Sequence, residues 1–353
     1  MTAPVNILLL GLGGNVSQGI LKALRKSQLP LRIIGGCVRA EAAGLYFCDH
    51  ALVTPYATDP HFINWLITTC NQFQIHGILT GVEEILIAMA LHQKALQQNT
   101  TARVISSSYE RLEICHDKLK TAHWLKANGL NYPKSVDAGN EADVLNLLND
   151  LGLPLFAKPK VGKGAKGAMR IDSIEQLNSL RGNAEYVIQE FLPEQQNEIT
   201  AASFSDIDGE VRGIILFKRD LQNGTTVCAQ VTHSPIVEQE VMRISQRLKP
   251  SGPCNMQLRM HRGKPVCFEI NLRYSGTAPI RAELGFNDVE AGIRHYILGE
   301  PAYDLAKIRN GFALRFWNEV YLDEQSYTRF QSKGSFENPA QSIQQFEQFG
   351  RKQ

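Results

Sequence analysis

The pentapeptide Glu269-Ile270-Asn271-Leu272-Arg273 alternates polar and apolar side chains. Successive side chains of an extended strand point to opposite faces, so Glu269, Asn271 and Arg273 share one face while Ile270 and Leu272 enter the core. Carboxylate and amide oxygens suit a hard cation such as Mg2+, and a guanidinium can grip phosphate. An ordinary strand with a polar outer face would show the same pattern, so the decision depends on the rest of the chain.

A basic, glycine-rich loop lies upstream of this pentapeptide. A short strand predicted over residues 155–160 carries Lys158, and the loop runs from Gly162 to Gly167. Glycines let backbone N–H groups approach phosphate oxygens, and the lysines of the loop add positive charge. No Gly-Lys-Ser/Thr follows, so this is not a Walker A loop. A solvated hairpin tip is the alternative interpretation.

The first 108 or so residues predict a parallel, doubly wound sheet, because short apolar runs alternate with helical stretches. The apolar run that begins at Val5 has no basic residues before it, so we expect a buried strand and not a signal peptide. We expect Asn15 or Ser17 to cap the helix that follows Gly11–Gly14. A dinucleotide site is disfavoured, because Val16 replaces the third glycine and no acidic residue ends the second strand. The expected strands are 5–10, 33–37, 51–53, 77–80 and 103–105.

The remainder of the chain predicts an antiparallel series of strands. A helix is expected from Asp117-Lys118 to Leu125, and another over residues 288–298. The polar, Gln-rich tail from Gln331 predicts a loosely packed helix or disorder. The expected strands are 185–192, one that begins at Glu198, 211–217, 252–260, 265–273 and 312–322.

The hairpin that ends in the pentapeptide carries a prediction about register. If Gln257 and Glu269 bind one ion they must share a face, so we expect them to lie directly opposite each other or offset by an even number of residues. A three-residue connection, Arg262-Gly263-Lys264, gives this pairing directly. A two-residue turn would send Glu269 to the other face unless a β-bulge restored the register.

Charge and cysteine content restrict the function further. The net charge of +2 over 353 residues is nearly neutral and the charges are interspersed, so we expect neither a nucleic-acid partner nor a membrane surface. The seven cysteines contain no Cys-x-x-Cys pair and are odd in number, which argues against a zinc site and a disulfide framework. We expect reduced, mostly buried thiols in a cytoplasmic protein.

Read in order, these motifs resemble the ATP-grasp superfamily, most closely the synthetase halves of the carbamoyl phosphate synthase large chain and related carboxylate–amine ligases. The resemblance covers about residues 1–300. It implies an α/β ATP-grasp fold with a Rossmann-like pre-ATP-grasp domain of parallel sheet at 1–110. It also implies an ATP-grasp domain of antiparallel sheets at 111–300, with a small lid at about 120–190, and leaves a C-terminal strand and polar tail at 301–353.

The resemblance assigns roles to particular residues. ATP would be bound by Lys118, Lys158, Gly162, Gly164, Lys166, Gly167, Gln189, Glu190, Phe191, Leu192 and Glu198. Mg2+, or Mn2+, would be held by Gln257, Glu269 and Asn271, and the catalytic cations would be Arg273, Lys218 and Arg219. Two departures from the family pattern are the absence of a glycine between Pro193 and Asn197 and the use of lysines at the first two phosphate positions.

Substrate residues do not follow from the motifs. We expect Arg281 to clamp a carboxylate, with Ser275 nearby, against the alternative that Arg281 pairs with Glu283 or faces solvent. His233 is a weaker candidate, because a lone histidine is more often structural.

The function implied by the resemblance is an ATP- and Mg-dependent ligase that activates a small carboxylate, such as an amino acid, as an acyl phosphate for attack by an amine. Its partners would be these two small molecules, and we expect a homodimer. One alternative is a kinase that makes carbamoyl phosphate or another acyl phosphate. Two others are a non-catalytic ATP sensor and an NAD-dependent oxidoreductase that would rest on Gly11–Gly14 alone.

Overall fold

The structure, a computed structural model, describes residues 3–162, 164, 166–193, 198–222, 224–316, 318–339 and 343–345. The chain divides into two compact units, and each is described by itself. The first unit comprises Met1–Ser106, Arg273–Tyr303 and Arg315–Gln353, and the second comprises Ser107–Leu272 and Asp304–Leu314. None of the described helices combines the length and the hydrophobicity needed to cross a lipid bilayer.

The first unit is built on a sheet whose strand order is β17-β3-β2-β1-β4-β5. Its five N-terminal strands pair in parallel, as the sequence predicts. Residues 6–10 of the central strand are buried, which explains its continuous apolar run. The parallel strands are β1 (Val5–Leu10), β2 (Leu31–Cys37), β3 (His50–Val53), β4 (Gly77–Thr80) and β5 (Arg103–Val104).

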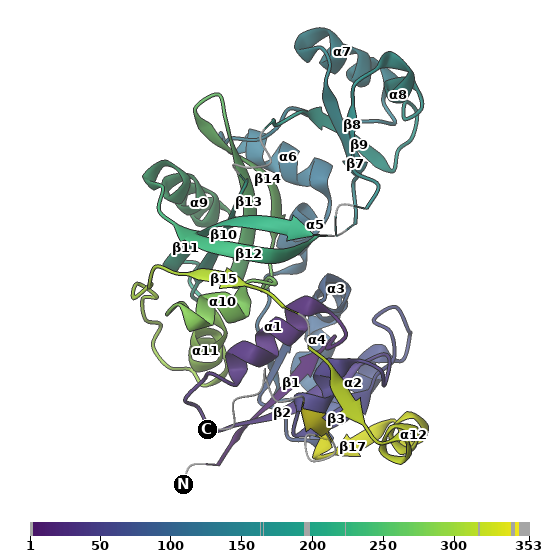
Figure 1. Cartoon of the computed structure of the whole chain (residues 1–353), viewed down its shortest axis with the longest axis vertical. Coiled ribbons are helices and arrows are strands. Elements are labelled where there is room, and N and C mark those ends of the chain that lie inside the picture. The colour runs from purple at the N-terminus through teal and green to yellow at the C-terminus, as the bar shows by residue number, and fades with distance from the viewer. Residues whose placement is uncertain are drawn as a thin grey trace. The chain divides into compact units, whose positions relative to one another are not determined.

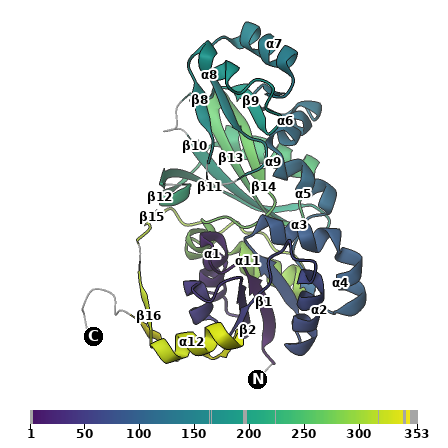
Figure 2. The same cartoon turned by 90° about the vertical axis from the view of Figure 1, so that its right-hand side faces the viewer.

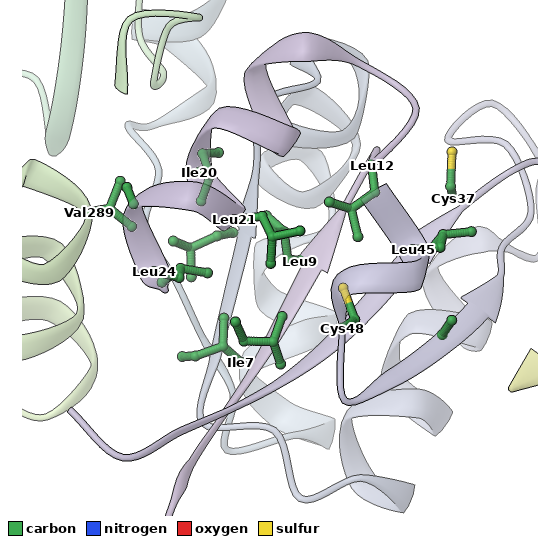
Figure 3. Packing of buried hydrophobic residues seen from close by; sticks show 14 of the residues in the cluster. Ile7, Leu9, Leu12, Ile20, Leu21, Leu24, Cys37, Leu45, Cys48 and Val289 are labelled. Carbon is green, nitrogen blue, oxygen red and sulfur yellow. The ribbon is translucent and has the colours of Figure 1, made fainter. Parts of the chain in front are cut away.

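Helices of the first unit come from three separate parts of the chain. They are α1 (Asn15–Leu24), η1 (Ala43–Phe47), α2 (Phe62–Gln72), α3 (Glu83–Leu91), α4 (Gln93–Asn99), α10 (Ala278–Glu283), α11 (Asp288–Gly292), η3 (Ile293–Ile297) and α12 (Glu324–Lys333). Figure 3 shows Ile7 and Leu9 of β1 packed near Ile20 and Leu21 of α1, with Val289 of α11 beside them. Segments more than 260 residues apart therefore share one core.

The start of α1 differs from the prediction. The N-cap position is Gly14, and no side chain caps the helix. Ser17 is instead buried one turn inside, where its hydroxyl donates to the Leu10 carbonyl at 2.8 Å and accepts from the Gly81 N–H at 3.0 Å. Ser17 thus ties the helix to the ends of β1 and β4.

The C-terminal part of the chain corrects two predictions. The single strand expected at 312–322 is two strands, β15 (Phe312–Leu314) in the second unit and β16 (Val320–Leu322), which pairs with β18 (Ile343–Gln345). The sequence predicts a loosely packed helix or disorder from Gln331, but helix α12 ends at Lys333 and is followed by β17 (Ser335–Glu337), which pairs antiparallel with β3. Residues beyond 345 lie outside the described part of the chain.

The second unit contains a large antiparallel sheet with the order β14-β13-β10-β11-β12-β15. Helix α9 (Pro235–Leu248) packs against β10, β11 and β14 (Figure 1), while α5 (Tyr109–His116) and α6 (Lys118–Ala127) pack against β14. The helix predicted from Asp117-Lys118 to Leu125 is confirmed, as α6. The other strands of this sheet are β10 (Glu198–Ser205), β11 (Val211–Gln222), β12 (Thr225–Thr232), β13 (Gly252–His261) and β14 (Lys264–Asn271).

A smaller antiparallel sheet belongs to the same unit, with the order β6-β9-β7-β8. Figure 2 shows α7 and α8 beside its strands β8 and β9. It has its own core, which includes Val144 of α7 and Ile188 of β9. The elements are β6 (Ser135–Asp137), α7 (Glu141–Leu151), β7 (Leu155–Pro159), β8 (Met169–Ile171), α8 (Ile174–Asn178) and β9 (Tyr186–Glu190).

Candidate functional site

A cavity of about 500 Å³ lies within the second unit, and both of its sheets contribute to the lining. Of the residues predicted to bind nucleotide, all except Gly167 line it. Gln257 and Glu269 of the predicted metal set also line it, as does Arg219. The cavity therefore brings together residues that are spread over about 150 positions of the sequence.

Lys158 is a buried cation at the cavity wall. Its side chain comes from β7, and Nζ donates to the Phe268 carbonyl at 3.2 Å while lying 5.5 Å from the centre of the Phe268 ring. Burial lowers the pKa of Lys158 to about 8, although Glu269 opposes the shift. An ammonium group that lacks hydration in this way gains from the arrival of an anionic ligand.

The predicted metal ligands converge on one carboxylate oxygen. Gln257 of β13 pairs with Glu269 of β14, as the register argument required. The Gln257 amide nitrogen donates to Glu269 Oε1 at 3.1 Å, and the Asn271 amide nitrogen donates to the same oxygen at 2.9 Å. Asn271 itself is buried and does not line the cavity directly.

The predicted three-residue connection between these strands is wrong. His261 pairs with Lys264, so the turn contains only Arg262 and Gly263, which have φ of 49° and 75°. Two residues with positive φ are typical of a type I′ turn. The register then shifts between Gln257 and Leu258, and Phe268 is the extra residue. This β-bulge keeps Glu269 on the face of Gln257 and presents the Phe268 carbonyl to Lys158.

The donor set fits a hard divalent cation of the Mg2+ type, since it offers one carboxylate and two amide carbonyl oxygens. The described residues contain no group of three or more His, Cys, Asp or Glu side chains placed to hold an ion. A cation here would therefore depend on Glu269, with the amides of Gln257 and Asn271 and with oxygen atoms of a bound ligand.

Glu198 is held between two arginines. Arg219 of β11 donates to its Oε1 and Arg259 of β13 donates to its Oε2, each at 2.9 Å. Arg259 also donates to the Leu192 carbonyl at 3.0 Å. Arg259 was not among the predicted site residues, although its spacing of two from Gln257 places it on the same face of the strand.

The end of β9 forms the apolar side of the cavity. The Phe191 ring lies 6.5 Å from that of Phe156 and 4.8 Å from the guanidinium of Arg170. Glu190 is held by His261 at 3.1 Å and by the Lys134 N–H at 3.3 Å. An aromatic wall of this kind suits a planar ligand such as a nucleobase.

The glycine loop meets two other parts of the second unit. Lys118, the first residue of α6, donates from Nζ to the Gly162 carbonyl at 2.9 Å. A Cβ at Gly224, in the turn between β11 and β12, would lie 2.8 Å from the Cα of Gly164. Gly167 has a structural reason for being glycine, because a Cβ there would lie 2.9 Å from the Tyr186 hydroxyl. Lys163, Ala165 and residues 194–197 lie outside the described residues.

Three predicted residues do not fit the roles expected of them. Lys218 is exposed on the face of β11 opposite to Arg219 and does not line the cavity. His233 is exposed and contacts Asn310 at 3.0 Å. Arg281 is fully buried in the first unit, where Asp288 accepts from its guanidinium at 2.6 Å.

The surroundings of Arg281 suit a structural role better than a carboxylate clamp. Its guanidinium also donates to Ser275 at 2.9 Å and to Thr277 at 3.1 Å. A substrate carboxylate would have to displace the Asp288 carboxylate from this buried pair, which is costly. Glu283, the alternative partner, pairs with Lys26 instead. Arg273 lies two residues beyond β14 and belongs to the first unit with Ser275.

Two sequence families match parts of this chain, and solved structures resemble its fold. The family described as "PylC-like, N-terminal domain" matches residues 7–105, and the family "ATP-grasp in the biosynthetic pathway with Ter operon" matches residues 183–320. The N5-carboxyaminoimidazole synthetase of Staphylococcus aureus, solved with ADP, superposes with a TM-score of 0.70 at 14% identity, covering 94% of this chain and 86% of that one. The chain has an ATP-grasp fold.

Two further relatives extend this identification. The L-amino acid ligase of Bacillus licheniformis aligns with a TM-score of 0.63 at 18% identity, over 87% of this chain and 77% of that one. The carbamoyl phosphate synthase large chain of Pseudothermotoga lettingae is 25% identical over 215 residues, or 56% of this chain. The ATP-grasp chain spans about a fifth (19%) of the length of that relative. The resemblance predicted from the motifs is confirmed.

Proposed function

We propose that this protein is an ATP- and Mg2+-dependent ligase that activates a small carboxylate as an acyl phosphate for attack by an amine. The observation that carries the proposal is that one cavity is lined by Lys118, Lys158, the glycine loop, Glu198 and Glu269 together. The ATP-grasp fold and the names of the structural neighbours, a carboxyaminoimidazole synthetase and an amino acid ligase, support it.

The residues of the cavity have separate tasks in this proposal. Lys118, Lys158 and the loop from Gly162 neutralise phosphate oxygens, since phosphoryl transfer needs positioning and charge compensation more than a protein nucleophile. Phe191, Leu192 and Glu190 bind the base, and Glu198 accepts from a ribose hydroxyl. The metal is held by Gln257, Glu269 and Asn271. When bound, ATP supplies the phosphoryl group that activates the carboxylate.

Two arginines remain as candidates for contact with the transferring group. Arg219 lines the cavity, and its guanidinium donates a hydrogen bond to Glu198. Arg273 keeps the role implied by its position two residues after Asn271, as a grip on the same phosphoryl group. We further propose that the acid is an amino acid or a similar small molecule, and that the protein is a cytoplasmic homodimer.

The nucleotide part of this proposal is tested by thermal shift. Mg-ATP should raise the melting temperature of the full chain and NADH should leave it unchanged, because ligand binding to the folded state alone stabilises it. A rise with NADH and none with Mg-ATP would overturn the proposal. Repeating the titration with EDTA measures how much of the ATP effect depends on the metal.

The ligase reaction is tested by measuring ADP release over a library of carboxylates and amines, with and without hydroxylamine. Hydroxylamine converts an acyl phosphate to a hydroxamate, so a productive acid should give a hydroxamate even when its natural amine is absent. Product that requires the amine supports the ligase. ADP release with a stable acyl phosphate would favour the kinase alternative, which the similarity to the carbamoyl phosphate synthase chain supports.

A further inference from the structure

We propose that Arg259 is a positioning residue that gives the site its preference for ribonucleotides, because it holds Glu198 in the orientation that a ribose hydroxyl requires. The inference deepens the proposed function and rests on it, since it concerns the sugar of the proposed nucleotide. It assigns a role to a residue that none of the sequence motifs singled out.

The Glu198 carboxylate must be held in one orientation by neighbouring side chains if it is to accept a hydrogen bond from a particular ribose hydroxyl. Its side chain is 8% exposed, and so is that of Arg219, whereas Arg259 is 17% exposed. Each carboxylate oxygen takes one hydrogen bond from one guanidinium at 2.9 Å. A carboxylate oxygen can accept a second bond, so both oxygens keep the capacity to accept from a ligand while the plane of the group is fixed.

Arg259 is itself held by two further contacts. Its second terminal nitrogen donates to the Leu192 carbonyl at 3.0 Å, and its guanidinium lies 5.1 Å from the centre of the Phe268 ring. Leu192 belongs to the segment proposed to bind the base, and Glu198 is proposed to bind the sugar. Arg259 therefore fixes the spacing between the two subsites, which suits the defined distance between base and ribose in a nucleoside.

Arg219 cannot replace this function alone. Its other described contact is a 3.5 Å bond from its guanidinium to the Thr226 hydroxyl on β12, away from the Leu192 carbonyl. Without Arg259, Glu198 would keep one partner and could rotate about its side-chain bonds. The Glu198 carboxylate would then have no fixed orientation. Removing a ribose hydroxyl from the ligand would therefore reduce the affinity by a smaller factor.

The test compares the affinities for Mg-ATP, 2′-deoxy-ATP and 3′-deoxy-ATP, measured by calorimetry on the full chain. Loss of a hydrogen bond to a charged group is worth about ten- to a hundredfold, so the wild type should prefer ATP over at least one deoxy analogue by about tenfold or more. In Arg259→Ala and in Glu198→Gln, the ratio of the affinity for ATP to that for the same deoxy analogue should fall to about threefold or less. The double variant should show no further loss, because the two residues act as one unit.

The control is Arg247→Ala, which removes an exposed arginine from the last turn of α9 and should keep the wild-type ratio. If Arg259→Ala does not fold, Arg259→Lys takes its place. Lysine keeps the charge but cannot reach Glu198 and Leu192 together, so a reduced ratio is again expected.

The outcomes separate this inference from the proposed function. No affinity of the wild type for Mg-ATP would overturn both. A wild type that binds ATP without discriminating against either deoxy analogue would overturn the inference alone. The inference alone is also overturned if the Arg259 variant that folds keeps the wild-type preference for ATP over the deoxy analogues. This holds whether or not Glu198→Gln loses that preference.

Discussion

Lys158 carries a charge whose burial is unfavourable in the folded protein. Its pKa in the folded protein is about 8, below the 10.5 of an ordinary lysine, chiefly because burial outweighs the favourable effect of Glu269. Lys118 and Arg259 add to the shift. The unfolded chain thus binds more protons than the folded one between about pH 8 and 10.5, so this group makes the free energy of unfolding rise with pH across that window.

We expect Lys158→Met to be more stable than the wild type at pH 7, by up to about 3 kcal/mol, when nucleotide and metal are absent. The difference should shrink toward zero as the pH rises to 10, because the wild-type lysine then folds without its charge. Urea unfolding at pH 7 and 9.5 measures both values. Lys126→Met, at an exposed lysine of α6, is the control and should show no such trend. An equal gain at both pH values would contradict the pKa assignment.

Glu269→Ala should reduce ADP formation by at least about a hundredfold, because it removes the only carboxylate of the proposed metal set. Its melting temperature should stay within a few degrees of the parent, since the change removes two side-chain hydrogen bonds, from the amides of Gln257 and Asn271. Glu238→Ala, at a partly exposed acid of α9, is the matched control. Turnover close to that of the wild type in Glu269→Ala would remove Glu269 from the site.

At the residue scale, strand alternation predicts much of the site. It placed Glu269 opposite Gln257, and the structure agrees. The same alternation forbids adjacent Lys218 and Arg219 from facing one cavity, and it puts Arg259 on the face of Gln257. Arg281 could not be judged in this way, because its partner Asp288 meets it through helix packing that local sequence does not encode.

At the element scale, the hairpin between β13 and β14 has the predicted pairing of Gln257 with Glu269, but it combines a two-residue turn with a β-bulge in place of the predicted three-residue connection. The sequence shows Arg262-Gly263 as a turn signal but does not show which strand carries the compensating extra residue. That choice is made by packing on the buried face of the sheet, which Cys267 and Ile270 share as the partners of Leu258 and Met256. Both are buried there because the chain bulges at Phe268, which leaves Glu269 on the cavity face. Strand alternation therefore predicts which face a residue occupies more reliably than it predicts the length of a turn.

The close approach of two loops gives a prediction at the same scale. Gly224→Ala should weaken Mg-ATP affinity by roughly tenfold, because a Cβ 2.8 Å from the Gly164 Cα would push the glycine loop away from its place. Gly263→Ala is the matched control, since Gly263 has a similar positive φ but no atom within 4 Å of a Cβ. Both variants carry backbone strain, so only the difference between their affinities reports the contact. Equal affinities would show that the contact has no role.

At the scale of the whole molecule, the sequence predicted three consecutive domains, whereas the two units of the structure interleave. Residues 273–303 follow β14 but pack in the core of the first unit, through Tyr274, Val289 and Ile293. Residues 304–314 return to the second unit, where β15 pairs with β12. Such crossings depend on partners that are distant in the sequence, and neither composition nor periodicity marks them.

The distribution of thiols provides a test of the whole fold. Cys228 is the only cysteine that is not buried, and burial raises the pKa of Cys48, Cys70 and Cys254 to about 12. A thiol reagent at pH 8 should therefore modify about one group in the native protein and all seven in denaturant. Cys228→Ser should abolish the native reaction. Rapid modification of several thiols in the native protein would mean that one of the cores is wrongly assigned.

The pairing of β17 with β3 has a consequence for how the protein is made. His50 of β3 contacts Ser335 of β17 at 2.8 Å, across 285 positions of sequence, and Phe336 packs edge-on against Tyr46. A ribosome that has released β1 to β5 has thus produced a sheet whose β3 edge still offers unpaired N–H and C=O groups. The growing chain must keep that edge from other strands until residue 337 emerges, so the first unit is begun first and finished among the last.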